Sequence, residues 1–195
     1  MNRVQKAILI GSILGDGNLD RPTRNGSRWI IKYDDKSLSY LIWLHSQLKE
    51  SGASEIKKKS GEYHQHYFFI RPSLEIGKWR NLFYPRGQKV IPKTIKSLLT
   101  DSISLAVWYM DDGCFDFREK YHRNANIATF CFSYKDCRLL AETLGVNFGV
   151  KARVHKCTMR GKMYYRLYIL SESTDRFFDL IRKYIQPCMS YKISS

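Results

Sequence analysis

The most informative segment of the chain is Ala7-Ile-Leu-Ile-Gly-Ser-Ile-Leu-Gly-Asp16-Gly17, an apolar helical run closed by Asp-Gly. The same signal recurs as Ser104-Leu-Ala-Val-Trp-Tyr-Met-Asp-Asp112-Gly113. The carboxyl end of a helix carries partial negative charge, which favours Lys or Arg over Asp, whereas a glycine there is typical of a helix end. A carboxylate at the tip of an apolar helix therefore indicates that a positive group, such as a divalent cation, binds against it.

The order of the elements around these two segments predicts an internal duplication, because the segments lie about half a chain length apart. Each is followed by a polar loop, a strand, a helix, two more strands and a closing helix. We expect an α+β protein with pseudo-twofold duplicated αββαββα halves at 1–84 and 102–195, joined by a linker at 85–101. The expected strands are 28–33, 56–59, 63–70, 126–132, 151–157 and 163–170, and the expected helices that follow the Asp-Gly segments are 36–50, 73–83, 134–144 and 173–185.

Small residues recur every four positions in the first segment, at Ala7, Gly11 and Gly15. Residues at this spacing lie along one face of a helix, so a second helix can approach closely there. If the two apolar helices pack side by side, their tips bring Asp16 and Asp112 together. Paired carboxylates are oxygen ligands suited to Mg²⁺.

The charge balance points to the partner. The chain has 195 residues, with 33 Lys and Arg against 18 Asp and Glu, and its formal net charge is +15. Such an excess favours a polyanion. We find no long apolar span and no basic amphipathic helix, so nucleic acid is preferred and no membrane partner is expected. Five cysteines without a Cys-x-x-Cys pair favour reduced thiols and an intracellular location, in an organelle or a prokaryotic cytoplasm.

Both segments resemble the signature of the LAGLIDADG homing endonucleases, at Leu9 to Gly17 and Leu105 to Gly113. The resemblance covers nearly the whole chain, and the form Trp-Tyr-Met-Asp-Asp-Gly is most similar to the monomeric, intron-encoded yeast mitochondrial branch. It implies paired central helices and two antiparallel sheets that form a DNA-binding saddle. It also implies a monomer that hydrolyses double-stranded DNA at a long asymmetric target with a staggered cut.

The resemblance implies Mg²⁺ as the cofactor, with Mn²⁺ as a substitute, and places the metal on the penultimate acid of each motif. These acids are Asp16 and Asp112. Asp111 is the rival ligand in the second motif. Aligning the two Asp-Gly pairs puts Asp111 opposite Gly15, so both are carried as candidate neighbours in the metal site.

The resemblance also implies one catalytic lysine for each half. The segment from Gln88 to Pro92 matches the first lysine pattern and gives Lys89, and the segment from Met189 to Lys192 matches the second and gives Lys192. The alternative for either lysine is a phosphate contact or a solvated surface position.

Recognition is expected from the strands, because a twisted β-ribbon fits the major groove and presents alternate side chains to base edges. The alternation in the second half separates basic and aromatic residues from apolar ones. The sequence leaves open which face each residue from Tyr63 to Tyr67 occupies. His64 and His66 point to the same side of the strand, and we interpret them as ordinary polar surface or DNA-facing residues rather than as a metal site, because no further ligands occur nearby in the sequence. The candidate DNA-binding residues are Arg28, Lys32, Lys57, Lys59, Arg153, His155, Tyr164, Arg166 and Tyr168.

Two other functions suit the same scaffold. One is an intron maturase that binds RNA and assists splicing, and the other is a DNA-binding protein that no longer cuts. The presence of both acids and both candidate lysines disfavours the non-cleaving protein. Nothing in the sequence separates an endonuclease from one with an added RNA role.

Overall fold

A computed structural model of the chain describes residues 1–59, 64–118 and 122–194. The first half consists of α1 (Arg3–Leu14), β1 (Asn18–Leu19), β2 (Ser27–Asp34), α2 (Leu38–Leu48), β3 (Lys57–Lys59), β4 (Gln65–Ser73) and α3 (Leu74–Phe83). The second consists of α5 (Ser102–Asp112), β5 (Gly113–Arg118), β6 (His122–Ala128), α6 (Tyr134–Phe148), β7 (Ala152–Met159), β8 (Lys162–Ile169) and α7 (Ser171–Ile181). The short helix α4 (Ile95–Leu98) lies between them, and one-turn 3-10 helices include Pro85–Gly87 and Pro187–Lys192.

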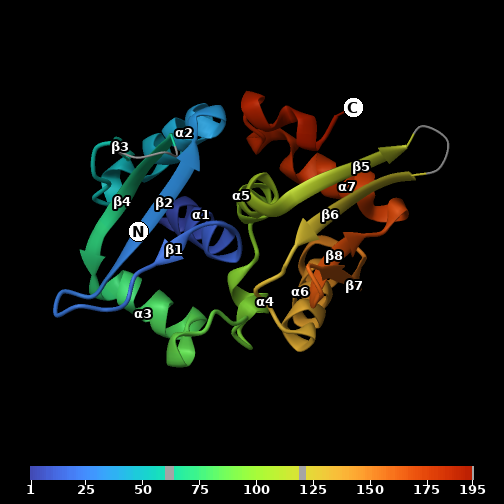
Figure 1. The fold of residues 1–195 in the computed structure, drawn as a ribbon, viewed down its shortest axis with the longest axis horizontal. Helices are drawn as coiled ribbons and strands as arrows, with labels where there is room; N and C mark the ends of the chain where they lie inside the picture. The colour runs from blue at the N-terminus through green and yellow to red at the C-terminus, as the bar shows by residue number, and fades with distance from the viewer. Residues whose placement is uncertain (60–63, 119–121, 195) are drawn as a thin grey trace.

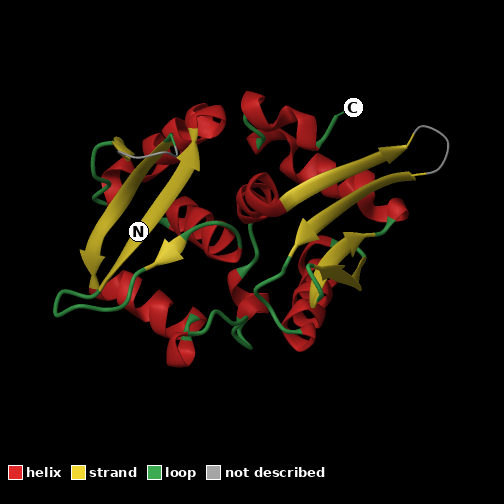
Figure 2. Cartoon of the chain, in the orientation of Figure 1, coloured by secondary structure: helices red, strands yellow, loops and turns green. Residues whose placement is uncertain are grey.

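The two halves build sheets of the same design. The first antiparallel sheet has the strand order β1-β2-β4-β3, and the second has the order β5-β6-β8-β7. The helices lie between and behind the sheets, with α1 and α5 side by side at the centre (Figures 1 and 2). This repeated order confirms the α+β class and the pseudo-twofold αββαββα duplication.

Two expected strands and one expected loop need correction or a limit. Residues 126–132 were expected as one strand, but β6 ends at Ala128, because the backbone turns where the N–H of Phe132 donates to the carbonyl of Thr129. β5 occupies a stretch that the sequence assigned to a polar loop. The start of the strand expected at 63–70 lies outside the described residues, and β4 itself begins at Gln65.

The small-residue stripe of α1 is the surface on which α5 packs. The hydroxyl of Ser104 donates to the carbonyl of Ala7 at 2.8 Å. A methyl group at Gly11 would overlap the Ser104 carbonyl and would lie 2.9 Å from Cβ of Val107. The absence of a side chain at Gly11 therefore allows the two helices to touch, as the spacing predicted.

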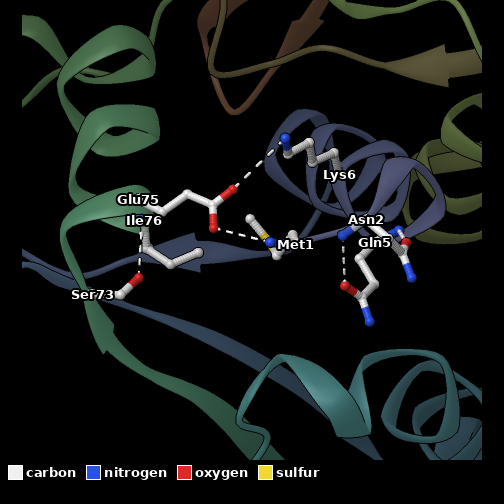
Figure 3. A network of polar contacts seen from close by, with 7 residues as sticks. All are labelled: Met1, Asn2, Gln5, Lys6, Ser73, Glu75 and Ile76. Atoms are coloured by element: carbon white, nitrogen blue, oxygen red, sulfur yellow. Dashed lines mark hydrogen bonds and ion pairs between the residues drawn. The ribbon is translucent and has the colours of Figure 1, made fainter.

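The amino end of α1 is anchored to α3 (Figure 3). The side chain of Asn2 accepts from the N–H of Gln5, and the Gln5 side chain accepts from the N–H of Asn2, which forms a capping box. The terminal ammonium of Met1 lies 3.0 Å from Glu75, in the first turn of α3, which Ser73 caps. This network fixes the amino end of α1. Because the helix is rigid, it also helps to position the carboxyl end, which Asp16 follows.

The described part of the chain contains no helix with the length and apolar character needed to cross a membrane. The largest buried side chains instead form a core beneath the sheets and around the central helices; they include Trp29, Trp108, Phe68, Phe83, Phe177 and Phe178.

Candidate active site at the tips of the central helices

The two central helices end where the Asp-Gly signals predicted. α1 ends at Leu14 with Gly15 as its C-cap, and α5 ends at Asp112 with Gly113 as its C-cap. Both glycines have negative φ values, −93° and −78°, so neither is the left-handed cap that usually ends a helix. Space explains them instead, because a Cβ at Gly15 would overlap the carboxylate of Asp111, and one at Gly113 would overlap Tyr109.

The carboxylate of Asp111 is occupied by protein donors. One oxygen accepts from the backbone N–H of Asp16 at 3.0 Å. The other accepts from the hydroxyls of Tyr33 at 2.5 Å and Tyr40 at 3.1 Å. Asp111 thus joins the tip of α1 to β2 and α2, and it differs from the exposed Asp16 in having both oxygens engaged.

The acids of the site share an electrostatic environment. Burial and then the negative charge of Asp16 raise the pKa of Asp111 to about 8. Burial, and again Asp16, raise the pKa of Asp112 to about 7, although the positive charges of Lys89 and Lys192 oppose this shift. The charges of Asp16, Lys89 and Lys192 thus all act on Asp112. The structure therefore brings the four residues expected to be catalytic together.

The two lysines occupy corresponding positions. The ammonium of Lys89 donates to the carbonyl of Gly15 at 2.9 Å. The ammonium of Lys192 donates to the carbonyl of Met110 at 2.6 Å and to that of Asp111 at 3.1 Å. Gly15 and Asp111 are the residues before Asp16 and Asp112, so each lysine is fixed next to one acid of the pair.

The environments of the two lysines differ. Lys192 lies in the 3-10 helix at Pro187–Lys192, only 8% exposed, and its carbonyl accepts from the hydroxyl of Tyr109 at 2.8 Å. Burial lowers its pKa, although Asp111, Asp112 and Asp16 act in the opposite direction. Lys89 is half-buried, with its ammonium 5.6 Å from the centre of the Phe132 ring.

The donor set fits a magnesium ion. The described residues contain no group of three or more His, Cys, Asp or Glu side chains arranged to hold a metal. Mg²⁺ binds through one or two carboxylates and keeps waters and substrate phosphates. Asp16 and Asp112 offer such a pair, since Asp16 lies close enough to raise the pKa of Asp112.

In the first sheet, the predicted basic residues share one face. Arg28 and Lys32 alternate along β2 with the buried Trp29 and Ile31. Cross-strand partners point to the same side of a sheet, and Tyr67 of β4 is opposite both Lys32 and Lys57. Lys59 is opposite Gln65, which is on the same face as Tyr67.

The register also settles the histidine left open by the sequence. His66 is opposite Tyr33 and Lys58, on the other face of the sheet, and its ring nitrogen lies 2.7 Å from the carboxylate of Asp35. His66 therefore lies on the face of the sheet opposite to that of Lys32, Lys57 and Lys59. Lys58, between two lysines of the basic face, points away from that face.

In the second sheet, the predicted residues again share a face. Arg153 is opposite Tyr168, and His155 is opposite Arg166. Tyr164 belongs to the same face, while Leu167 and Ile169 are buried on the other. The rings of His155 and Tyr168 stack with centroids 4.7 Å apart and planes 7° apart.

Sequence reasoning missed three polar residues of these surroundings. Tyr33 and Tyr40 contact Asp111 across about 70 residues of chain, and neither stands in a motif. Asn126 lies opposite Tyr168, on the face of the second sheet that carries Arg153 and Arg166, in a strand that was placed too late in the chain. Only the three-dimensional register brings these residues to the site.

A model of the LAGLIDADG DNA endonuclease family matches residues 6–177. The chain belongs to this family. It is 30% identical over 209 residues to the cytochrome b mRNA maturase bI2 of Saccharomyces cerevisiae, covering 97% of this chain but only 47% of the maturase. It is 27% identical over 214 residues to the DNA endonuclease I-ChuI of Chlamydomonas applanata, covering 100% of this chain and 96% of that protein.

Solved structures of LAGLIDADG proteins share the fold. The homing endonuclease I-WcaI bound to its DNA recognition sequence superposes with a TM-score of 0.81 at 22% identity, over 98% of this chain and 86% of that one. A structure of I-DmoI in complex with DNA and Mn superposes with a TM-score of 0.60 at 18% identity, over 98% and 97% of the two chains. At these identities the likeness establishes the fold.

Proposed function

We propose that the chain is a site-specific DNA endonuclease that hydrolyses one phosphodiester in each strand of a long asymmetric target and leaves a staggered cut. The observation that carries this proposal is the repeated unit at the helix tips. Each half contributes a carboxylate, Asp16 or Asp112, next to a carbonyl that holds a lysine ammonium. Two equivalent units suit two equivalent bonds, one in each strand.

The residues present have distinct parts in such a reaction. A divalent ion on Asp16 and Asp112 would supply an activated water and would neutralise charge on the phosphate. The ammonium groups of Lys89 and Lys192, fixed on main-chain carbonyls, add positive charge where negative charge develops in the transition state. Asp111 positions Asp16 through its N–H and leaves the metal to the flanking acids.

The test is cleavage of supercoiled plasmids that carry the uninterrupted host-gene sequence, with Mg²⁺ or with EDTA. Asp16→Asn and Asp112→Asn should each lower the rate of double-strand cleavage by at least about 100-fold, because each removes a ligand of the ion. Glu142→Gln, which changes the same charge on the exposed outer helix α6, should cut like the parent. Cleavage that persists in both aspartate variants, or a parent that binds without cutting, would contradict the proposal.

A second function is favoured by a specific finding, the 30% identity to a protein named as an mRNA maturase. We propose intron RNA as an alternative partner of the same scaffold. Splicing of the host intron transcript with and without the protein tests this function. Splicing that depends on the protein and survives Asp16→Asn would establish an RNA role separate from cleavage.

A further inference from the structure

Three arginines converge on a concavity that the catalytic site does not use. Arg21 follows β1, Arg80 lies in the last turn of α3, and Arg86 lies in the one-turn helix at Pro85–Gly87. They line a hollow of about 430 Å³ together with Asn81 and Tyr84, and none of the described residues that line it is acidic.

The guanidinium of Arg80 is buried and has no negative partner among the described residues. Arg80 is 7% exposed, and one of its terminal nitrogens donates to the neutral carbonyl of Tyr84 at 3.1 Å. The guanidinium carbon lies 4.1 Å from the centre of the Tyr84 ring, which holds the group in place. Its Nε finds no hydrogen-bond partner among the described residues. A buried charge without a counter-ion is costly, so this position indicates that an anion completes it.

Asp20, the acid next to Arg21 in the sequence, is already occupied by other partners. Both carboxylate oxygens of Asp20 are engaged, one by Asn18 at 2.9 Å and the other by two nitrogens of Arg28 at 2.8 Å and 2.7 Å. Arg21, the next residue, is exposed and has no ion pair with any described residue. The pocket therefore keeps its three positive charges.

The backbone at Arg86 gives an independent observation. Arg86 has φ 57° and ψ 21°, in the left-handed region that side chains rarely adopt, and Gly87 follows at φ 81°. Glycine or asparagine holds such a turn at lower cost. The strained position is thus occupied by a side chain that contributes charge to the pocket rather than by one suited to the turn.

The pocket lies beside the first half-site. Tyr84 interacts with the backbone of Leu19, three residues after Asp16. Arg86 precedes Lys89 by three residues, a span of at most about 11 Å, and the Lys89 ammonium is on the carbonyl of Gly15.

We infer that Arg21, Arg80 and Arg86 form a pocket for one backbone phosphate of the bound DNA, a few nucleotides from the phosphodiester held at Asp16 and Lys89. The inference rests on the proposed endonuclease function for its choice of DNA. A forked guanidinium with free N–H donors matches phosphate oxygens, and Arg80, held in advance by Tyr84, loses little freedom when it binds.

The test measures binding of a short duplex in Ca²⁺ across about 50 to 200 mM salt, where each phosphate contact contributes about 0.9 to the slope of log K against log salt. The Arg21→Gln, Arg86→Gln double variant, with both changes at exposed positions, should lower the slope by about that amount and weaken binding several-fold. Each single variant should lower the slope by a smaller part, because the three arginines share one phosphate. Arg3→Gln, at the opposite end of α1, removes the same charge and should leave the slope unchanged. Arg80→Lys keeps the positive charge but removes the forked guanidinium. Thermal unfolding checks that this variant is folded.

Replacing single phosphates by methylphosphonate in the target duplex locates the contact. One position should weaken binding by the parent but not by the Arg21→Gln, Arg86→Gln double variant. The inference would be overturned if the pocket variants showed the same salt slope as Arg3→Gln, or if they lost binding to intron RNA but not to DNA. It would also be overturned if millimolar inorganic phosphate bound at Arg86 while DNA binding by the variants was unchanged. A parent that never cuts while the variants still lose their slope would refute the proposed cleavage and support the pocket.

Discussion

Gly15 and Asp111 occupy corresponding places in the two central helices, yet one has no side chain and the other has a carboxylate. The carboxylate of Asp111 fills the space that a side chain at Gly15 would need, and it accepts the N–H of Asp16 there. The two halves therefore differ at this position in a complementary way, because the side chain that Gly15 lacks leaves room for the carboxylate of Asp111. It also explains why Asp111 is held by protein donors whereas its neighbour Asp112 is the candidate metal ligand.

A methyl group at Gly15 should damage the site. Gly15→Ala would push against the Asp111 carboxylate, so we expect a loss of about 1–3 kcal/mol in the free energy of unfolding and cleavage reduced by at least about tenfold. The matched control is Gly145→Ala in α6, where an added Cβ meets open space. That variant should gain about 0.5–1 kcal/mol. Thermal unfolding and plasmid cleavage measure both effects, and equal behaviour of the two variants would contradict this account.

The stability of the metal-free protein should fall as pH rises through the range in which Asp112 ionises. Its pKa is about 7 in the folded chain against an ordinary 3.8, so between these values the folded state holds more protons than the unfolded state. The free energy of unfolding then decreases with rising pH, by at most about 1.4 kcal/mol per pH unit for one group.

Asp112→Asn should reduce this dependence and raise the melting temperature near neutral pH in EDTA, while Asp111, whose pKa is also raised, to about 8, keeps its own contribution. Mg²⁺ should stabilise the parent but not the variant. Melting temperatures between pH 5 and 8, with Glu142→Gln as the control, measure the effect. An unchanged slope in Asp112→Asn would show that Asp112 is not the titrating group.

At the scale of the elements, antiparallel register decides which charges share one face of the first sheet. Lys57 and Lys59 share the face of Tyr67 and Gln65, while Lys58 lies on the face of His66. All three lysines are exposed, so exposure alone does not distinguish them. The alternation of side chains along β3 distinguishes them, because it places Lys58 on the other face of the sheet.

This run provides an internal comparison of three adjacent residues. Lys57→Gln and Lys59→Gln should each lower the salt slope of DNA binding by about 0.9, as expected for one lost phosphate contact. Lys58→Gln should change the slope by much less. Binding of a short duplex in Ca²⁺ across a salt series measures all three. A Lys58 variant that loses as much as its neighbours would show that general charge, not the face of β3, governs binding.

The elements also show where sequence reasoning succeeds. The apolar runs ending at Asp16 and Asp112 have helical length and clear stops, and the stripe at Ala7, Gly11 and Gly15 predicted the packing of α1 on α5. β1 could not be predicted, because its two residues have no periodicity and pair only with a strand formed elsewhere. Lys192 stood out only by resemblance, since nothing local indicates that a terminal segment returns to α5.

At the scale of the whole molecule, one chain supplies both half-sites and both sheets. We therefore expect a monomer that binds its target with one chain per duplex. Light scattering of the free protein and titration of a labelled duplex measure this stoichiometry. Cleavage rates should be proportional to protein concentration below saturation, whereas a second-order dependence would indicate that two chains assemble on the DNA.

The fit between Gly15 and Asp111 has a consequence for recombination between halves of such proteins. Two copies of the first half would meet glycine to glycine and leave a hole at the centre of the helix pair. Two copies of the second half would force two aspartate side chains into the space that now holds one. At this contact, the shape of each half is thus complementary to that of the other half and not to its own. A chimera that exchanges one half must carry a glycine or an aspartate at this place to suit the half that remains.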